Sequence, residues 1–83
     1  MLTGPNPAHG TFAFVTRGPK RYLGTLAIYD VAGRVVDVVQ QPMGTPLVWD
    51  GRTSAGRIAQ GGIYFYRASA NGIERTGHVV LLR

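Results

Sequence analysis

Trp49 and Asp50 are the residues whose types and positions most readily suggest a binding function. Trp49 is the only tryptophan, and it stands directly before Asp50 and Gly51. An exposed indole ring could stack on a ligand, although packing at the edge of a sandwich core with the N–H bonded to backbone is the commoner arrangement. Asp50 could bind a cation, but calcium takes several oxygen ligands and no second carboxylate lies near Asp50 in sequence. The sequence therefore favours an Asx turn, in which Asp50 accepts backbone N–H groups of its own loop.

The histidines, serines and carboxylates give no positive support for an enzyme. His9 and His78 lie far apart, and neither has a ligand partner two or four residues away, whereas a zinc site needs three or four ligands. Ser54 and Ser69 lack the setting of a nucleophile elbow and have no obvious base. The chain has no cysteine and only four carboxylates, so thiol chemistry is excluded. We expect no catalytic residue, no metal site and no cofactor.

Glycine and arginine are the two remaining residue types that could carry binding. The twelve glycines do not form the GxGxxG or GxxxxGK spacing of phosphate-binding loops, so we interpret them as turn residues. The net charge is +5, and eight of the nine basic residues are arginine. Only Arg17, Lys20 and Arg21 cluster in sequence, without interleaved aromatic residues. We therefore expect scattered solvent-facing arginines and no specific nucleic-acid partner.

Short β-rich segments separated by turn signals must position these residues. No segment of ten residues keeps a helical apolar period without a glycine or proline, so helix is not expected beyond a single turn. Several short strands in a chain of 83 residues predict an all-β, immunoglobulin-like antiparallel β-sandwich of about seven strands. The seven candidates are Thr11–Thr16, Tyr22–Tyr29, Arg34–Val39, Pro46–Trp49, a brief strand at Ile58, Ile63–Ala70 and Ile73–Leu82.

Two tight turns connect neighbouring strands in this prediction. Asp30 and Gly33 begin and end a turn, because aspartate caps turn amides and glycine supplies positive φ. Asn71-Gly72 is the strongest short hairpin signal in the chain, because a type I′ turn needs positive φ at both positions. Tyr64 and Tyr66 share one face of their strand. They form either an exposed aromatic stripe or a cover over the sandwich edge, and the sequence leaves both alternatives open.

The chain is predicted to contain one domain. Residues 1–10 include two prolines, which predict an extended lead-in, and residues 11–83 form the single sandwich. Residues 1–10 show no basic segment followed by an apolar one, so no signal peptide is expected in this chain. No apolar run reaches the roughly 20 residues of a membrane span.

Four stretches taken together resemble a known family. They are Asn6-Pro7, LAIYDVAGRVV at 26–36, WDGRTSAGR at 49–57 and GGIYFYRASANGIERTGHVVLLR at 61–83. In order and spacing they resemble the C-terminal sorting domains of type IX-like secretion and the related immunoglobulin-like domains of flagellar hook-capping proteins. The resemblance implies a non-catalytic C-terminal module of a secreted or cell-surface bacterial protein, acting in sorting, anchoring or interaction. The motif residues that it singles out as structural are Tyr29, Asp30, Gly33, Trp49, Asp50, Gly51, Gly56, Gly62, Tyr64, Asn71 and Gly72.

The same resemblance implies a protein partner. That partner is the secretion machinery, another domain of the parent protein or a neighbouring subunit, and the oligomeric state is left open. The last strand is the candidate contact, because an unpaired strand edge can accept another strand. The candidate edge residues are Ile73, Val79, Val80, Leu81, Leu82 and Arg83. The alternative is a structural subunit of an extracellular filament or cap, in which residues 1–10 add to the sheet of a neighbour.

Overall fold

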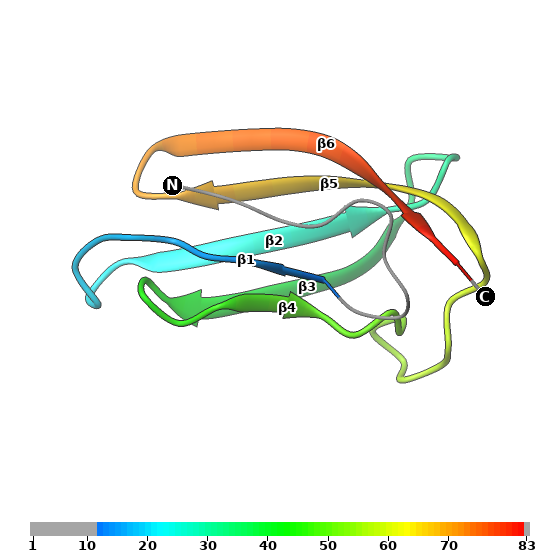
Figure 1. Cartoon of the computed structure of the whole chain (residues 1–83), viewed down its shortest axis with the longest axis horizontal. Helices are drawn as coiled ribbons and strands as arrows, with labels where there is room; N and C mark the ends of the chain where they lie inside the picture. The colour runs from blue at the N-terminus through cyan, green and yellow to red at the C-terminus, as the bar shows by residue number, and fades with distance from the viewer. Residues whose placement is uncertain (1–11, 83) are drawn as a thin grey trace.

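The computed structural model describes residues 12–82, and this part of the chain contains strands and no helix. Six strands follow one another along it (Figure 1). Their bounds are β1 Phe12–Phe14, β2 Leu23–Tyr29, β3 Val35–Pro42, β4 Leu47–Trp49, β5 Gly62–Ala70 and β6 Ile73–Leu81. The expected lead-in, residues 1–10, lies outside the described residues.

Four strands form the larger sheet, in the order β3-β2-β5-β6 with every neighbouring pair antiparallel. Its strands show the period of two that one buried face requires. In β2, Leu26 and Ile28 are fully buried, whereas Ala27 and Tyr29 between and after them are half-buried. In β5, Tyr64 and Ala68 are buried on the same face. The alternation therefore directs one face of the larger sheet into the core.

Both predicted turns close hairpins of this sheet. Asn71 and Gly72 have φ of 48° and 81°, as a type I′ turn requires, and Ala70 pairs with Ile73 across them. The β2–β3 hairpin contains a bulge, because Tyr29 pairs with Val35 while Ile28 pairs with Asp37. Val36 is the extra residue, and it packs against the core cluster. The bulge thus adds an apolar contact at the start of β3.

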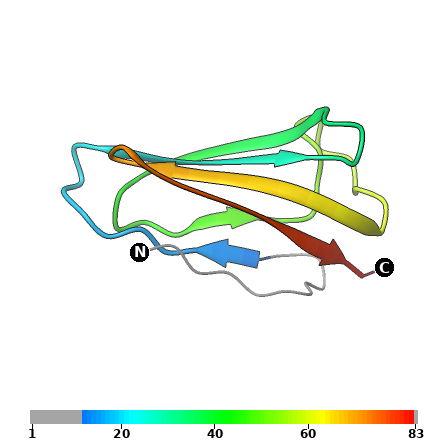
Figure 2. The same cartoon turned by 90° about the horizontal axis from the view of Figure 1, so that it is seen from above.

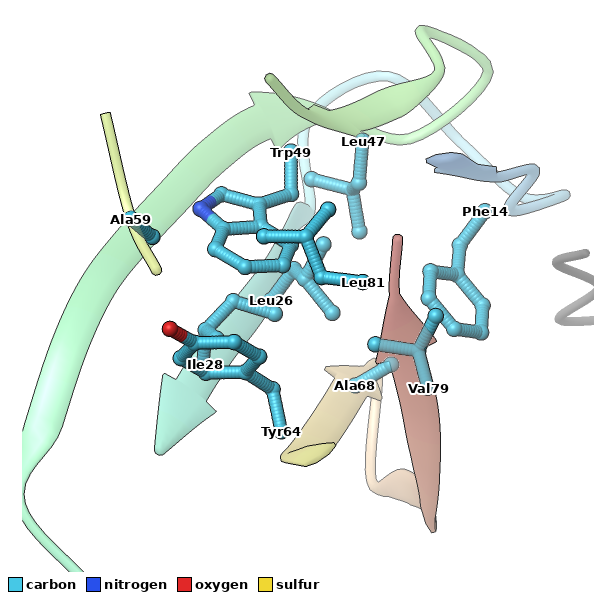
Figure 3. Packing of buried hydrophobic residues seen from close by; sticks show 10 residues of the cluster. All are labelled: Phe14, Leu26, Ile28, Leu47, Trp49, Ala59, Tyr64, Ala68, Val79 and Leu81. Atoms are coloured by element: carbon cyan, nitrogen blue, oxygen red, sulfur yellow. The ribbon is translucent and has the colours of Figure 1, made fainter. Parts of the chain in front are cut away.

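The smaller sheet consists of β1 and β4, which pair antiparallel. Seen from above, these two strands form a layer beside the larger sheet (Figure 2). The core lies between the two sheets (Figure 3). The all-β immunoglobulin-like sandwich expected from the sequence is therefore confirmed. The buried residues of the core cluster are Phe14, Leu26, Ile28, Leu47, Trp49, Ala59, Tyr64, Ala68, Val79 and Leu81.

Two features of the strands differ most from the sequence-based prediction, whereas the other strand ends shift by only one or two residues. The fifth candidate segment, at Ile58, forms an isolated bridge with Arg52 and no strand, because the turn around Gly56 folds these residues back on themselves. β3 runs on to Pro42, although residues 40–45 were expected to form a loop. Proline is tolerated there because β3 is the edge strand of its sheet and Pro42 is its last residue.

Gly77 allows β5 and β6 to pack closely on the core face. It pairs with Tyr66 across the ladder. A Cβ added at Gly77 would lie 2.5 Å from the Tyr66 Oη and 2.7 Å from its Cζ. The Tyr66 ring in turn lies 4.6 Å, centroid to centroid, from the ring of Phe14. Glycine at position 77 therefore makes room for an aromatic contact between the two sheets.

Candidate functional site

Asp30 holds together the turn between β2 and β3. Its Oδ1 accepts the backbone N–H groups of Ala32 at 2.9 Å and Arg34 at 3.0 Å, and its Oδ2 accepts Nε of Arg34 at 3.0 Å. Gly33 has a φ of 80° and donates its N–H to the Asp30 carbonyl at 3.0 Å. These bonds, led by the one from the Arg34 backbone, hold the pKa of Asp30 below its ordinary value. The carboxylate is thus occupied by its own turn.

Trp49 is fully buried, so its ring is not available as a stacking surface for a ligand. Its Nε1 donates to the carbonyl of Arg52 at 2.8 Å, and its ring lies 5.1 Å from that of Tyr64. Tyr64 is also buried, and its hydroxyl donates to the Gln60 carbonyl at 2.6 Å. The two aromatic rings therefore anchor both ends of the loop that connects β4 to β5.

That loop, residues 50–61, is folded by its own hydrogen bonds. Asp50 Oδ1 accepts the N–H of Arg52 at 3.0 Å, which is the expected Asx turn. Thr53 donates to the Arg57 carbonyl at 2.7 Å, and the Gly56 N–H donates back to Thr53 at 2.9 Å. Gly51 and Gly56 have φ of 75° and 82°, which is the left-handed region that favours glycine. The motif residues here therefore shape the loop.

The Asp30 turn and the 50–61 loop meet at one end of the sandwich, where they form an open groove. The Ser54 N–H donates to the Val36 carbonyl at 2.9 Å and ties the loop to β3. The groove has a volume of about 490 Å³, and the start of β5 forms its third wall. Val31, Ile58 and Ile63 line it and are exposed. The sequence did not indicate this groove, because its walls come from three segments that are separate along the chain.

β6 lies at the edge of the larger sheet, where the sequence placed the partner contact. Val79 and Leu81 of the predicted edge are buried in the core, so their side chains cannot contact a partner. Val80 is half-buried and engaged in a further interaction. Ile73 and Leu82 are exposed, and Arg83 lies outside the described residues. Contact of β6 with a partner by addition of a strand, as expected from the sequence, does not require these side chains and stays a prediction.

The contact expected from the sequence uses the backbone of β6. In a two-residue hairpin the residues flanking the turn form a hydrogen-bonded pair, and every second pair along the ladder is non-hydrogen-bonded. Counting from Ala70 and Ile73, the residues Glu74, Thr76 and His78 occupy non-hydrogen-bonded positions. Their N–H and C=O groups face away from β5. These three residues form what we call the open edge.

The two tyrosines that share a face of β5 belong to the core side. Tyr64 is buried and Tyr66 is half-buried against the core cluster, so they do not form an exposed stripe. The exposed aromatic row lies on the opposite face, where Phe65 stands 6.5 Å from His78, ring to ring. Tyr29 pairs with Phe65 and continues the row across the sheet. A hollow of about 320 Å³ lies over this row.

Residues 12–82 show no group of three or more histidine, cysteine, aspartate or glutamate side chains that could hold a metal ion. His9, the second histidine, lies outside this part of the chain. Nor does any helix long and apolar enough to span a membrane occur there.

Gly62 begins β5 and closes the groove wall beside Tyr64, while Asn71 and Gly72 lie at the opposite end of the sheet. The structural motif residues therefore do not all gather at one place.

The chain was compared with known proteins at three levels. A scan against models of protein families found no match, and a search of curated proteins found none either. Among solved structures, the chain is similar to PorZ, described as an essential bacterial surface component of the type IX secretion system of Porphyromonas gingivalis. The superposition has a TM-score of 0.68, covers 99% of this chain and 11% of PorZ, and shows 17% identity. At this identity the likeness to PorZ shows the fold.

A second similar structure is dimeric latent PorU from the same organism. It matches with a TM-score of 0.69 and 25% identity, over 98% of this chain and 9% of PorU. The chain thus spans about a tenth of either protein. Neither of these two is a flagellar hook-capping protein, so they lend no support to that part of the resemblance. The filament alternative rests on residues 1–10, which lie outside the described residues.

Proposed function

We propose that this chain is a non-catalytic, C-terminal interaction module of a secreted or cell-surface bacterial protein, recognised during export by a type IX-like secretion machinery. The observation that carries the proposal is the superposition of nearly the whole chain on a small part of PorZ, a surface component of that machinery. The superposition covers 99% of this chain but only 11% of PorZ, so a fold like that of this chain occurs as one module within a larger protein. The motifs at 26–36, 49–57 and 61–83 support the same assignment.

The open edge supplies a means of recognition. Backbone groups at Thr76 and His78, together with the N–H of Glu74, whose carbonyl accepts Arg75 Nη1 at 3.1 Å, can pair with an extended segment of a partner, which would add a strand to the larger sheet. This mode of binding suits a module that many parent proteins share, because main-chain hydrogen bonds do not depend on the partner's side chains. The partner in this proposal is a protein, and the module needs no cofactor.

Deleting residues 79–83 is a poor test of recognition. The deletion removes Val79 and Leu81, which are each 1% exposed and belong to the core. Loss of two buried aliphatic side chains destabilises a domain by several kcal/mol, at about 2–5 kcal/mol each. A failure of export would then report unfolding as readily as lost recognition. A substitution on the open edge separates the two effects.

The sharper test uses Thr76→Pro in a reporter that is fused to the chain and produced in Porphyromonas gingivalis. Proline removes an outward-facing N–H of the edge strand and leaves the ladder to β5 intact. Thr76→Ala is the matched control, because it keeps the N–H. We expect surface delivery with the intact chain and with Thr76→Ala, and a clear reduction with Thr76→Pro, while thermal unfolding shows that all three chains fold.

The two parts of the proposal fail separately. If the intact fusion stays inside the cell, the chain is not an export module. If Thr76→Pro is delivered as well as Thr76→Ala, recognition does not use the open edge. The groove between the Asp30 turn and the 50–61 loop is then the next surface to test.

A further inference from the structure

The net charge of residues 12–82 is concentrated at one end of the sandwich. At the end with the Asp30 turn and the 50–61 loop, positive and negative charges are equal in number. Three arginines lie there beside three of the four carboxylates: Arg34, Arg52 and Arg57 with Asp30, Asp37 and Asp50. The fourth carboxylate, Glu74, pairs with Arg67 at 3.5 Å. The uncompensated basic residues among the described ones are Arg17, Lys20, Arg21 and Arg75.

These four residues lie at the opposite end, which we call the basic end. Arg17, Lys20 and Arg21 belong to the connection between β1 and β2, and Arg75 follows the β5–β6 turn. Both views place this connection and this turn at the same end of the molecule (Figures 1 and 2). The clustering in space therefore goes beyond the short sequence cluster and includes a residue more than fifty positions away.

The β1–β2 connection holds its basic side chains in a fixed frame. The Tyr22 N–H donates to the Pro19 carbonyl at 3.1 Å, and Met43 donates to the Tyr22 carbonyl at 2.9 Å. The Gly44 N–H donates to the Thr16 carbonyl at 3.1 Å, and Thr16 is itself buried. The guanidinium of Arg21 lies 4.9 Å above the ring of Tyr22. A loop that is already ordered by hydrogen bonds loses less conformational freedom on binding than a loop that is not.

Exposed apolar side chains accompany the charges at the basic end. Leu23 is 55% and Ile73 is 53% exposed, and Tyr22 is 38% exposed. Gly24 pairs with Ala70, and Ala70 pairs with Ile73, so these residues share the same end of the sheet. Neither the groove nor the hollow described above includes them. The basic end therefore presents exposed charged and apolar side chains next to one another.

We propose that the basic end docks the module onto an anionic lipid surface. Each lysine or arginine near such a surface contributes a favourable attraction, and apolar side chains beside them enter the boundary between headgroups and acyl chains. A nucleic acid fits less well, because successive bases stack on several aromatic side chains, whereas the β1–β2 connection offers the ring of Tyr22, and Arg21 lies over one face of that ring. The inference rests on the charge distribution and does not depend on the proposed role in secretion.

Binding to lipid vesicles tests the proposal with the 83-residue chain itself. The probes are vesicles of phosphatidylcholine alone and vesicles in which about a third of the lipid is phosphatidylglycerol, with co-sedimentation as the measurement. We expect binding to the anionic vesicles and none to the neutral ones. The affinity should fall as salt screens the charges. Absence of binding to the anionic vesicles at low salt overturns the proposal.

Two variants of equal net charge locate the contact. Arg17→Gln with Lys20→Gln lowers the charge by two units at the basic end, and Arg57→Glu lowers it by two units at the other end. At about 1 kcal/mol for each basic residue near the surface, the double variant should bind roughly thirtyfold more weakly. Arg57→Glu should stay within about threefold of the parent, since it lies far from the contact. Equal losses in the two variants would mean that net charge alone governs binding, which contradicts a docking end.

Leu23→Ser distinguishes a lipid surface from other polyanions. Leu23 is 55% exposed and does not belong to the core cluster, so the substitution should leave the core intact. We expect several-fold weaker binding to anionic vesicles, because an inserted leucine is lost, and no change in binding to a single-stranded oligonucleotide. An oligonucleotide that binds the parent chain more tightly than the vesicles do would overturn the lipid assignment in favour of nucleic acid.

Discussion

Replacing Trp49 tests whether the WDGR motif acts through the core or through a ligand. Trp49 is fully buried and its indole N–H is bonded to the Arg52 carbonyl. Trp49→Ala removes the largest fully buried side chain of the domain, and such changes cost about 3–5 kcal/mol. A chain of 83 residues has a total stability of about 4–12 kcal/mol. We therefore expect Trp49→Ala to unfold at a much lower urea concentration than the parent chain, and to be unfolded at room temperature if the parent lies at the lower end of that range.

Trp49→Phe separates the hydrogen bond from the packing. The variant keeps an aromatic ring beside Tyr64 but leaves the Arg52 carbonyl without its indole donor, a loss of about 1–3 kcal/mol. Together with the smaller ring, we expect a destabilisation of about 2–4 kcal/mol. Urea unfolding followed by far-ultraviolet circular dichroism measures both variants. Val48→Ala is the matched control, because Val48 is 46% exposed on the same strand and should change stability by less than 1 kcal/mol or so.

One result would refute a core role for Trp49. If Trp49→Ala unfolds at the same urea concentration as Val48→Ala, the tryptophan does not contribute to the core. The parent chain gives an independent check, since Trp49 is its only tryptophan. Its fluorescence should be protected from acrylamide quenching in the folded state, and this protection should be lost in the same transition that circular dichroism reports.

Three further substitutions follow from the geometry. Gly77→Ala should destabilise the domain by about 1–3 kcal/mol, because its Cβ would lie 2.5 Å from the Tyr66 Oη. The loss of stability should be smaller when Tyr66 is also replaced by valine. Additive losses of stability in this double-mutant cycle would contradict the contact. Asn71→Val should cost about 1–2 kcal/mol because φ is 48° there, whereas Asn71→Gly should be neutral or stabilising, and equal unfolding midpoints for the two would refute the turn assignment. Asp30 has a pKa below its ordinary value when folded, so the stability it contributes is complete above the ordinary value and is lost as the pH falls through the folded one. Asp30→Asn should therefore weaken the dependence of the urea unfolding midpoint on pH below about pH 4. An unchanged dependence on pH would show that the turn does not depend on this carboxylate.

The strand framework could be predicted because local signals and burial agree along most of the chain. Leu26 and Ile28 alternate with less buried residues, and Asn71-Gly72 fixes the register of the longest hairpin. The prediction of a strand at Ile58 was wrong, because one β-branched residue between glycine turns forms a single bridge and no ladder. β3 extends three residues beyond the predicted end at Val39, because an edge strand tolerates proline at its last position.

The surfaces were harder to predict than the strands. Val79 and Leu81 were assigned to a partner edge because a terminal strand of an open sheet has an unpaired side, but period-two alternation turns both side chains into the core. The groove and the basic end combine segments that only the fold brings together. Arg75 lies far from Arg17 in sequence, and no local pattern relates them. Charge segregation of this kind follows from topology and becomes visible only with the strand order.

The most direct test of the proposed function is the dependence of delivery on the secretion apparatus. A reporter enzyme that carries its own signal peptide would be fused in front of the 83-residue chain and produced in Porphyromonas gingivalis with and without a working type IX system. The amount of reporter on the cell surface and in the medium is the measurement. We expect delivery in the cells with the apparatus and retention in those without it. Equal delivery in both, or retention in both, would contradict a module that the type IX machinery recognises.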